Sequence, residues 1–329
     1  MAVVLVTGAT GLTGSNVCRQ LAERGDRPRA LVRNPSTAQA LADTGAELVA
    51  GDVTDAASVL AASRGADAVI HTAALLGGES QDCAAFQAVN GEGTRNVLDA
   101  AETVGLRRVV AFSTGSFLDM AASPDLEDAP LLDSPPDDPY TQTKLAAYQE
   151  VHRRAAAGLD ALTCHPGAIY GESPVPERAL ARTTFNRVIL AGLRGRLTES
   201  LGYPVSWVTG DDVARGALAA LDRGTAGSRY WFLGHPDDRT SMASLCNEAI
   251  AIAGFGHRVR DVDPLGDQEA LTTRYGPTLV AVARKIVTEP HPARPVISKT
   301  GRAIGYTPTR RADGLRTLVS WLRRIGRLG

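Results

Sequence analysis

TGATGLTG, at residues 7–14, is the most informative stretch of this sequence. It follows a short apolar run over residues 2–6 and leads into a helical pattern over residues 12–24. Glycines at such a strand–helix junction allow a tight turn and a close approach of the backbone to a pyrophosphate, and the helix N-terminus offers free N–H groups to the phosphates. We therefore predict that this loop binds a dinucleotide. The predicted contact residues are Gly8, Thr10, Gly11, Leu12, Thr13 and Gly14.

Apolar, strand-like runs alternate with helical patterns through the first half of the chain. After the first run, strands are predicted at residues 28–33, 47–50, 66–72, 107–113 and 159–165, and long helices at residues 84–104 and 140–157. This alternation is typical of a parallel sheet that is covered by helices on both faces. We therefore predict the α/β class, with a Rossmann-type doubly wound parallel sheet.

The pattern becomes less regular after about Gly171. A basic helix at residues 178–196 and a segment broken by Pro and Gly at residues 254–308 predict a smaller lobe. Residues 205–208 and 229–232 still resemble strands, so the lobe is expected to be interleaved with the sheet. We predict a dinucleotide-binding Rossmann domain at residues 1–171 and a mainly substrate-binding C-terminal lobe at residues 172–329. Within this lobe, a segment at about 203–233 is predicted to return to the sheet.

Composition and charge exclude several classes of protein. The chain has 329 residues, of which 44% are hydrophobic, and its 35 basic residues balance 36 acidic ones. Such a chain is not disordered, and its balanced charge argues against a nucleic-acid partner. The apolar runs are too short to cross a membrane, and the N-terminus lacks the basic region of a signal peptide, so we expect a cytoplasmic protein.

The four cysteines and six histidines are dispersed along the chain. None of them falls into a spacing that is typical of a metal site or of a disulfide framework. We therefore expect no metal, and any difficult chemistry must come from an organic cofactor or from oxygen and nitrogen side chains.

The end of the second predicted strand bears on the choice of dinucleotide. Rossmann domains that bind NAD usually place Asp or Glu there, on the ribose 2′-OH, whereas Arg suits a 2′-phosphate. Here the strand ends in Leu31-Val32-Arg33-Asn34, with no carboxylate. Because Arg33 is permanently charged and can bind phosphate with two hydrogen bonds, we expect NADP(H) to be preferred over NAD(H). The alternative is that Arg33 is only a solvated charge at the end of the strand.

A tyrosine and a lysine stand four residues apart at the start of a predicted helix, in Tyr140-Thr141-Gln142-Thr143-Lys144. This spacing places both side chains on one helical face. A phenol is a poor acid–base catalyst until its anion is stabilised, and a neighbouring ammonium group would lower its pKa. Only three of the 35 basic residues are lysines, so a lysine at this place suggests a role that Arg cannot fill.

Hydroxyl groups follow the fifth predicted strand, in Phe112-Ser113-Thr114-Gly115-Ser116. Side chains at the carboxyl end of such a strand face the ligand crevice of a doubly wound sheet. We expect Thr114 to hydrogen-bond a substrate oxygen while Tyr140 exchanges a proton with it. An ordinary Ser/Thr turn at the end of the strand is the alternative.

These residues together resemble the extended short-chain dehydrogenase/reductase family, over nearly the whole chain. Seven landmarks follow the order of that family: residues 7–14, 51–53, 71–74, 89–97, 112–116 with Tyr140 and Lys144, 165–171 and 207–214. Residues 31–35 and the C-terminal residues 305–322 are similar to the branch that contains dihydroflavonol reductases and 3β-hydroxysteroid dehydrogenases. One departure is His165, which stands where the family usually has Arg.

The resemblance implies further site residues. Asp52 and Val53 correspond to the segment that contacts the adenine, Thr72, Ala73 and Ala74 to the segment that lines the cofactor, and Pro166 and Ile169 to the segment beside the nicotinamide. Thr114, Tyr140 and Lys144 correspond to the catalytic triad. Lys144 is then expected to bind the nicotinamide ribose, and the family also suggests a homodimer.

The predicted function is the reduction of a carbonyl group in a small organic substrate to an alcohol. A sugar-nucleotide epimerase or dehydratase with tightly bound NAD would use the same triad, and a non-catalytic NADP(H) sensor is a further alternative. A diphosphate could be held by the basic helix, through Arg178, Arg182, Arg187, Arg194 and Arg196, although such charges more often form a solvated face. Loops at residues 75–86, 117–139 and 174–196 are expected to set the substrate.

Overall fold

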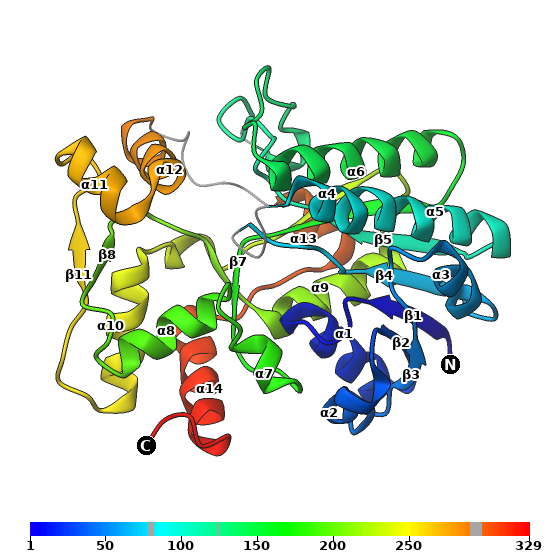
Figure 1. Cartoon of the computed structure of the whole chain (residues 1–329), viewed down its shortest axis with the longest axis horizontal. Coiled ribbons are helices and arrows are strands. Elements are labelled where there is room, and N and C mark those ends of the chain that lie inside the picture. Colours follow the sequence, from blue (N-terminus) through cyan, green and yellow to red (C-terminus); the bar gives the residue numbers. More distant parts are fainter. Residues whose placement is uncertain (78–81, 124, 290–297) are drawn as a thin grey trace.

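The structure is a computed structural model and contains a parallel sheet of seven strands, which lies in the right-hand half of Figure 1. Residues 1–77, 82–123, 125–289 and 298–329 are described. The strands are β1 (Val3–Thr7), β2 (Arg27–Val32), β3 (Glu47–Ala50), β4 (Ala68–His71), β5 (Arg108–Phe112), β6 (Ala161–Pro166) and β10 (Arg229–Phe232). Their order is β10-β6-β5-β4-β1-β2-β3, so the predicted Rossmann-type doubly wound sheet is confirmed.

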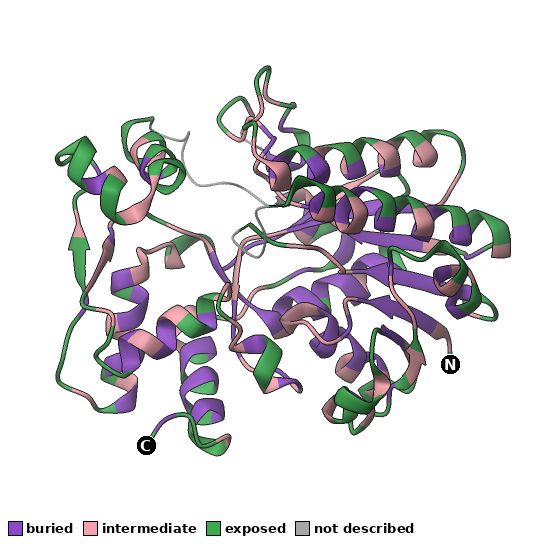
Figure 2. Cartoon of the chain, viewed as in Figure 1, coloured by how far each residue is buried: buried purple, intermediate pink, exposed green. Residues whose placement is uncertain are grey.

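Helices cover both faces of this sheet. One face carries α1 (Leu12–Glu23), α2 (Gln39–Ala42), α9 (Gly210–Arg223) and α13 (Ser298–Ile304), and the other carries α3 (Ala56–Ser63), α5 (Gly93–Val104) and α6 (Pro139–Ala156). Val4 and Val6 of β1 pack into the first layer and Leu5 into the second, because successive side chains of a strand point to opposite faces. The strands are therefore largely buried between two apolar layers, except the edge strand β3, whose residues are exposed or half-buried (Figure 2).

Two predicted helices are interrupted. The helix expected at residues 84–104 consists of α4 (Cys83–Phe86), a π-helical turn (Gln87–Glu92) and α5. The basic helix expected at residues 178–196 is divided into α7 (Pro176–Ala179) and α8 (Phe185–Leu193), because the Thr184 side chain accepts a hydrogen bond from the Arg187 N–H and caps a new helix.

One predicted strand does not enter the main sheet. The run at residues 205–208 forms β9 (Trp207–Thr209), which pairs in parallel with β7 (Ala168–Tyr170) in a separate two-stranded sheet. The expectation that this segment returns to the sheet is therefore wrong for β9, whereas β10 does pair with β6. The chain leaves the main sheet after β6 at Gly167, where an added Cβ would lie 2.6 Å from the Ser206 carbonyl oxygen, so β9 and the chain after β6 run side by side.

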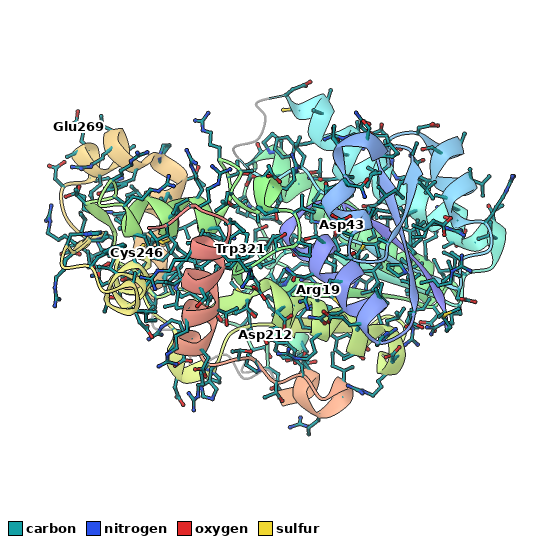
Figure 3. All side chains as sticks on the ribbon, turned by 90° about the horizontal axis from the view of Figure 1, so that it is seen from below. Arg19, Asp43, Asp212, Cys246, Glu269 and Trp321 are labelled. Carbon is teal, nitrogen blue, oxygen red and sulfur yellow. The ribbon has the colours of Figure 1, made fainter. Side chains whose placement is uncertain are left out.

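The second lobe has a core of its own. It contains α8, α10 (Met242–Ala253) and α14 (Arg311–Arg324), whose side chains Cys246 and Trp321 belong to one buried cluster (Figure 3). Beside it lie β8 (Glu199–Leu201), β11 (Arg260–Val262), α11 (Gln268–Tyr275) and α12 (Pro277–Thr288). Short 3₁₀ turns complete the described elements: η1 (Pro35–Thr37), η3 (Leu126–Asp128) and η4 (Pro236–Asp238). The division of the chain at residue 171 stays a prediction.

Asp212, which is labelled in Figure 3, ties the C-terminal segment to the sheet side of the molecule. Its buried carboxylate accepts hydrogen bonds from the Thr309 N–H at 2.9 Å and the Thr309 hydroxyl at 2.8 Å, and it pairs with Arg215. The neighbouring Asp211 pairs with Arg19, so α9 is also fixed to α1. None of the helices within the described ranges is long and apolar enough to cross a membrane.

Candidate active site

The strand order changes direction between β1 and β4, and their carboxyl ends meet there. Ligands of doubly wound sheets bind outside the strands at this switch point. Gly8 directly follows β1 and has a φ of 66°. A Cβ at Gly8 would lie 2.6 Å from the backbone nitrogen of Ala73, so only glycine lets the two loops approach this closely.

The loop between β1 and α1 fits the pyrophosphate of a dinucleotide. Gly11 is the N-cap of α1 and offers no side chain to cap it, which leaves the first N–H groups of the helix available to an anion. A Cβ at Gly14 would lie 2.4 Å from the Gly8 carbonyl oxygen, so this glycine allows the helix to pack against the turn. The remaining predicted loop residues, Thr10, Leu12 and Thr13, are half-buried at the same place.

Arg33, Asp52 and Val53, which are predicted to contact the adenosine side of the cofactor, follow strands β2 and β3. Arg33 is exposed directly after β2, and its guanidinium makes no hydrogen bond or ion pair with any residue that the structure describes. Asp52 closes the turn after β3, because one carboxylate oxygen accepts from both the N–H and the hydroxyl of Thr54 at 2.9 Å. The buried Val53 accepts a hydrogen bond from Asn96 through its carbonyl at 2.8 Å. A free cation therefore lies at the end of β2, where an NAD-binding domain usually has a carboxylate.

Asn90 supports the cofactor-lining loop after β4, which begins with Thr72, Ala73 and Ala74. The buried Asn90 amide bonds to both the N–H (2.8 Å) and the carbonyl (3.1 Å) of Leu75, and it donates to the Thr143 hydroxyl at 3.2 Å. It therefore joins this loop to α6. We did not predict Asn90 as a site residue, and the signal was its place in the family landmark at residues 89–97.

The predicted triad residues come together at the start of α6 and the end of β5. Asp138 caps α6 by accepting from the Thr141 N–H at 2.9 Å, which places Tyr140 in the first turn. Tyr140 is hydrogen-bonded to Thr114, and Lys144, one turn further on, donates to the Phe112 carbonyl at 2.6 Å.

Thr114 and Ser113 differ in their surroundings. The Thr114 hydroxyl meets Tyr140, whereas the buried Ser113 hydroxyl has no hydrogen-bond partner among the described residues. The choice of Thr114 over its neighbour as the residue that faces a substrate oxygen stays a prediction, and this contact supports it.

Burial raises the pKa of Tyr140, the hydrogen bond with Thr114 opposes this, and Asp138 adds to it. The expectation that Lys144 lowers this pKa when a dinucleotide is bound stays a prediction. Burial lowers the pKa of Lys144 itself to about 8. At neutral pH the site therefore holds a protonated phenol, ready to donate, beside a lysine that is still charged.

His165, where the family usually has Arg, holds the loop that carries Thr114. Its Nδ1 lies 2.9 Å from the Thr114 carbonyl oxygen and its Nε2 lies 3.0 Å from the Thr163 hydroxyl. The same hydroxyl lies 3.1 Å from His152 Nε2 on α6. Burial lowers the pKa of His165 to about 3 and that of His152 to about 4, so both rings are neutral at pH 7.

His165, Thr163 and His152 form one network, and the chemistry of its donors and acceptors fixes the direction of each hydrogen bond in it. A carbonyl only accepts, so His165 Nδ1 must donate to Thr114 and its Nε2 must accept from the Thr163 hydroxyl. That hydroxyl has one proton, and it therefore accepts from His152 Nε2–H. We did not predict this network from the sequence, because nothing in the spacing of the two histidines and the threonine shows that they meet.

An apolar cavity of about 520 Å³ opens beside this loop, starting at Gly115 and Ser116. Pro166, predicted at the nicotinamide side, lines it, whereas Ile169 packs against the first core layer instead. Two of the three loops expected to set the substrate contribute to the wall: residues 117–139 and 174–196. The described residues of loop 75–86 do not, and its residues 78–81, like residue 124, lie outside the described part. The other wall residues include Met120, Leu126, Phe185, Val188, Trp207, Trp231, Leu233, Arg239, Met242, Leu279 and Ile286.

The arginines proposed as a diphosphate grip do not line this cavity. Arg178, Arg182, Arg187, Arg194 and Arg196 are all exposed. Within the described residues there is also no group of three or more His, Cys, Asp or Glu side chains that could hold a metal ion.

A doubly wound sheet with a glycine loop at its switch point and a Thr–Tyr–Lys cluster beside it defines an extended short-chain dehydrogenase/reductase. The model of the NAD dependent epimerase/dehydratase family matches residues 4–231, and the chain belongs to this family. The resemblance seen in the sequence is thereby confirmed.

Individual relatives agree with this assignment. The chain is 29% identical to sterol demethylase protein B of Methylococcus capsulatus over 98% of both chains. It is 35% identical to a 3 beta-hydroxysteroid dehydrogenase/Delta 5→4-isomerase of Mycobacterium tuberculosis over 60% of this chain and 54% of that one. Among solved structures, the crystal structure of gox2253 is similar over 100% of both chains, with a TM-score of 0.82 and 28% identity.

The hydrogen-bond chain through Thr163 makes a first prediction. Thr163→Val should lower the free energy of unfolding by about 2 kcal/mol, because it leaves the half-buried donor of His152 and the buried acceptor of His165 without partners. Thr163→Ser keeps the hydroxyl and should cost clearly less. Denaturant unfolding measures both, and equal losses in the two variants would contradict the chain. Nitrogen-15 spectra of the imidazoles should show the proton on Nδ1 of His165 and on Nε2 of His152.

Proposed function

We propose that this protein is an NADP(H)-dependent oxidoreductase that reduces the carbonyl group of a small, largely apolar organic substrate to an alcohol. The observation that carries this proposal is the cavity, whose wall starts directly after Thr114 and is mainly apolar. Such a cavity suits a hydrophobic molecule presented to the hydroxyls of Thr114 and Tyr140. The names of two relatives, which refer to a sterol and a hydroxysteroid, support an apolar substrate.

The same observation argues against a sugar nucleotide as the substrate. A nucleotide diphosphate and a sugar together need many polar partners, and the five arginines that might hold them are exposed outside the cavity. The alternative of a non-catalytic sensor receives no support from a site that keeps both Tyr140 and Lys144. Carbonyl reduction is therefore the function that the site supports best.

The residues have separate roles in this proposal. When bound, NADP(H) would supply the hydride, held by the loop at Gly8–Gly14, by Lys144 at the nicotinamide ribose and by Arg33 at the 2′-phosphate. Thr114 donates a hydrogen bond to the substrate oxygen and orients it. Tyr140, protonated at neutral pH because its pKa is raised, gives its proton to that oxygen. The charge of Lys144 then stabilises the phenolate that remains.

In this proposal the protein contributes to catalysis largely by holding the reacting groups in a fixed orientation. Lys144 and His165 hold the backbone on either side of Ser113, at the Phe112 and Thr114 carbonyls. Fixed groups of this kind lower the entropic cost of bringing reacting atoms together. A homodimer and a cytoplasmic location stay predictions.

Removing the phenol hydroxyl tests the proton donor. Tyr140→Phe should reduce carbonyl-dependent NADPH oxidation by at least about 100-fold, the range that proton transfer contributes, while NADPH affinity changes little. A panel of apolar ketones and aldehydes, followed by NADPH absorbance, provides the assay. Tyr275→Phe is the control, because its hydroxyl bonds to Glu199 and neither residue is among those that line the cavity. Full turnover in Tyr140→Phe would remove this residue from the mechanism.

The charge at the end of β2 tests the cofactor. Arg33→Asp should weaken NADPH binding by about 10- to 100-fold, the equivalent of a lost charge-assisted hydrogen bond, and should leave NADH binding nearly unchanged. Calorimetric titration of both dinucleotides measures the ratio. The matched control is Arg107→Asp, an exposed arginine at the opposite, amino-terminal end of β5. An unaltered ratio in Arg33→Asp would overturn the assignment of the 2′-phosphate.

The lowered pKa of Lys144 predicts a pH dependence. A lysine is charged below its pKa, so the charge that stabilises the phenolate is lost as the pH rises through about 8. The rate of reduction at saturating NADPH should therefore fall with a midpoint near pH 8, well below the usual value for lysine. Single-turnover rates between pH 6 and 10 measure this midpoint. A rate that stays constant to pH 10 would show that the charge of Lys144 does not contribute.

A further inference from the structure

A single charged side chain faces the cavity. Among the described residues of its wall, only Arg239 carries a charge. Arg239 follows the short turn η4, and the rest of the wall is aliphatic, aromatic or hydroxylic. An apolar cavity with one cation differs both from a purely hydrophobic pocket and from a polar nucleotide site.

Arg239 has almost no partner in the protein. Its Nε is buried without a hydrogen bond among the described residues, and one terminal nitrogen lies 3.5 Å from the Pro204 carbonyl, at the limit of a hydrogen bond. It forms no ion pair with the described carboxylates. Burial lowers the pKa of Arg239, yet a guanidinium remains charged in proteins.

The carboxylate of Asp238, which is next to Arg239 in the chain, is already engaged. It accepts a hydrogen bond from the Arg311 N–H at 2.9 Å and pairs with Arg310 at 3.8 Å. A partly buried charge without a partner is costly, and proteins usually pair such charges. The described residues therefore leave the Arg239 guanidinium available to an anion from outside the protein chain.

We propose that the cavity takes a substrate with an apolar body and one anionic group of the carboxylate type, and that Arg239 binds this group. The inference rests on the proposed function in that the same molecule would present its carbonyl to Thr114 and Tyr140. Arg239 is then a specificity-determining residue, because it fixes which end of an otherwise featureless apolar molecule lies beside the catalytic hydroxyls. A planar guanidinium can hold a carboxylate with two hydrogen bonds.

The apolar walls match the remainder of such a molecule. Phe185 and Trp207 stand edge to face, with ring centroids 5.2 Å apart, and Trp231 lies on the wall next to Leu233. Aromatic and aliphatic walls bind a hydrophobic body without specifying its direction. A single ion pair within these walls supplies that direction.

Two fluorescent probes that differ in one group test this proposal. 8-Anilino-1-naphthalenesulfonate carries a sulfonate, and N-phenyl-1-naphthylamine has the same ring system without it. Trp207 and Trp231 line the cavity, so energy transfer from tryptophan to the probe reports binding near it. Saturating NADP⁺ is added first, because the dinucleotide site itself offers Arg33 and the N-terminus of α1 to an anion. In this state the wild-type protein should bind the anionic probe at least about 10-fold more tightly than the neutral one, and high salt should weaken only the anionic probe.

Variants locate the preference. Arg239→Met and Arg239→Gln should each weaken the anionic probe about 10-fold or more and change the neutral probe less than about twofold, as expected for one lost charged interaction. Arg107→Met, the exposed arginine at the far end of β5, should change neither. Equal binding of both probes to the wild-type protein, or an equal loss for both in the variants, would overturn the proposal, and the wild-type comparison holds even if a variant does not fold.

A second set of measurements separates this inference from the proposed function. Tyr140→Phe should keep the full preference for the anionic probe although it loses turnover. If the wild-type protein prefers the anionic probe but reduces no carbonyl compound, the proposed function is contradicted and the inference about Arg239 is not. Displacement of the anionic probe by uridine diphosphate at similar concentration would overturn the inference, because it would indicate a nucleotide site.

Discussion

The close approach of two loops at the switch point of the sheet is the constraint on which the rest of the structure depends. A side chain at Gly8 would collide with the Ala73 backbone, and one at Gly14 would collide with the Gly8 carbonyl. These contacts set the position of α1 relative to β1 and leave its uncapped N-terminus facing the crevice. The same helix then packs on α9, whose Asp211 and Asp212 connect it to Arg19 and to the C-terminal segment at Thr309. The close packing of the backbone at this turn therefore also helps to position the second lobe.

A neutral histidine, His165, and a charged lysine, Lys144, both hold the loop after β5. Lys144 donates to the Phe112 carbonyl and His165 to the Thr114 carbonyl. The backbone between these two carbonyls carries the hydroxyl side chains of Ser113 and Thr114. His165 donates without a charge, because it is buried and its second nitrogen is occupied by Thr163. The arginine that the family usually has at that position would add a permanent positive charge near Lys144, whereas the neutral ring adds none. The neutral ring therefore holds the loop while Lys144 remains the charged group of the site.

The described wall of the cavity also contains few charged side chains. The cavity wall is apolar except for Arg239 and a few hydroxyls, so a ligand gains most of its affinity from burial and its orientation from one ion pair. An ion pair in such surroundings is screened much less than one on the surface. For this reason a single arginine is sufficient to distinguish the two ends of a hydrophobic molecule.

The sequence by itself determined the features that are local in the chain. The glycine turn, the alternation of strands and helices, the free arginine at residue 33 and the four-residue spacing of Tyr140 and Lys144 each depend on neighbouring residues, so periodicity and spacing were sufficient to predict them. Only the tertiary structure decided that β9 pairs with β7 outside the main sheet, that the pKa of Tyr140 is raised, that His152, Thr163 and His165 form one chain, and that Arg239 faces the cavity. These features join elements that are distant in sequence, and their geometry and burial follow from how strands and helices pack, which no local pattern encodes.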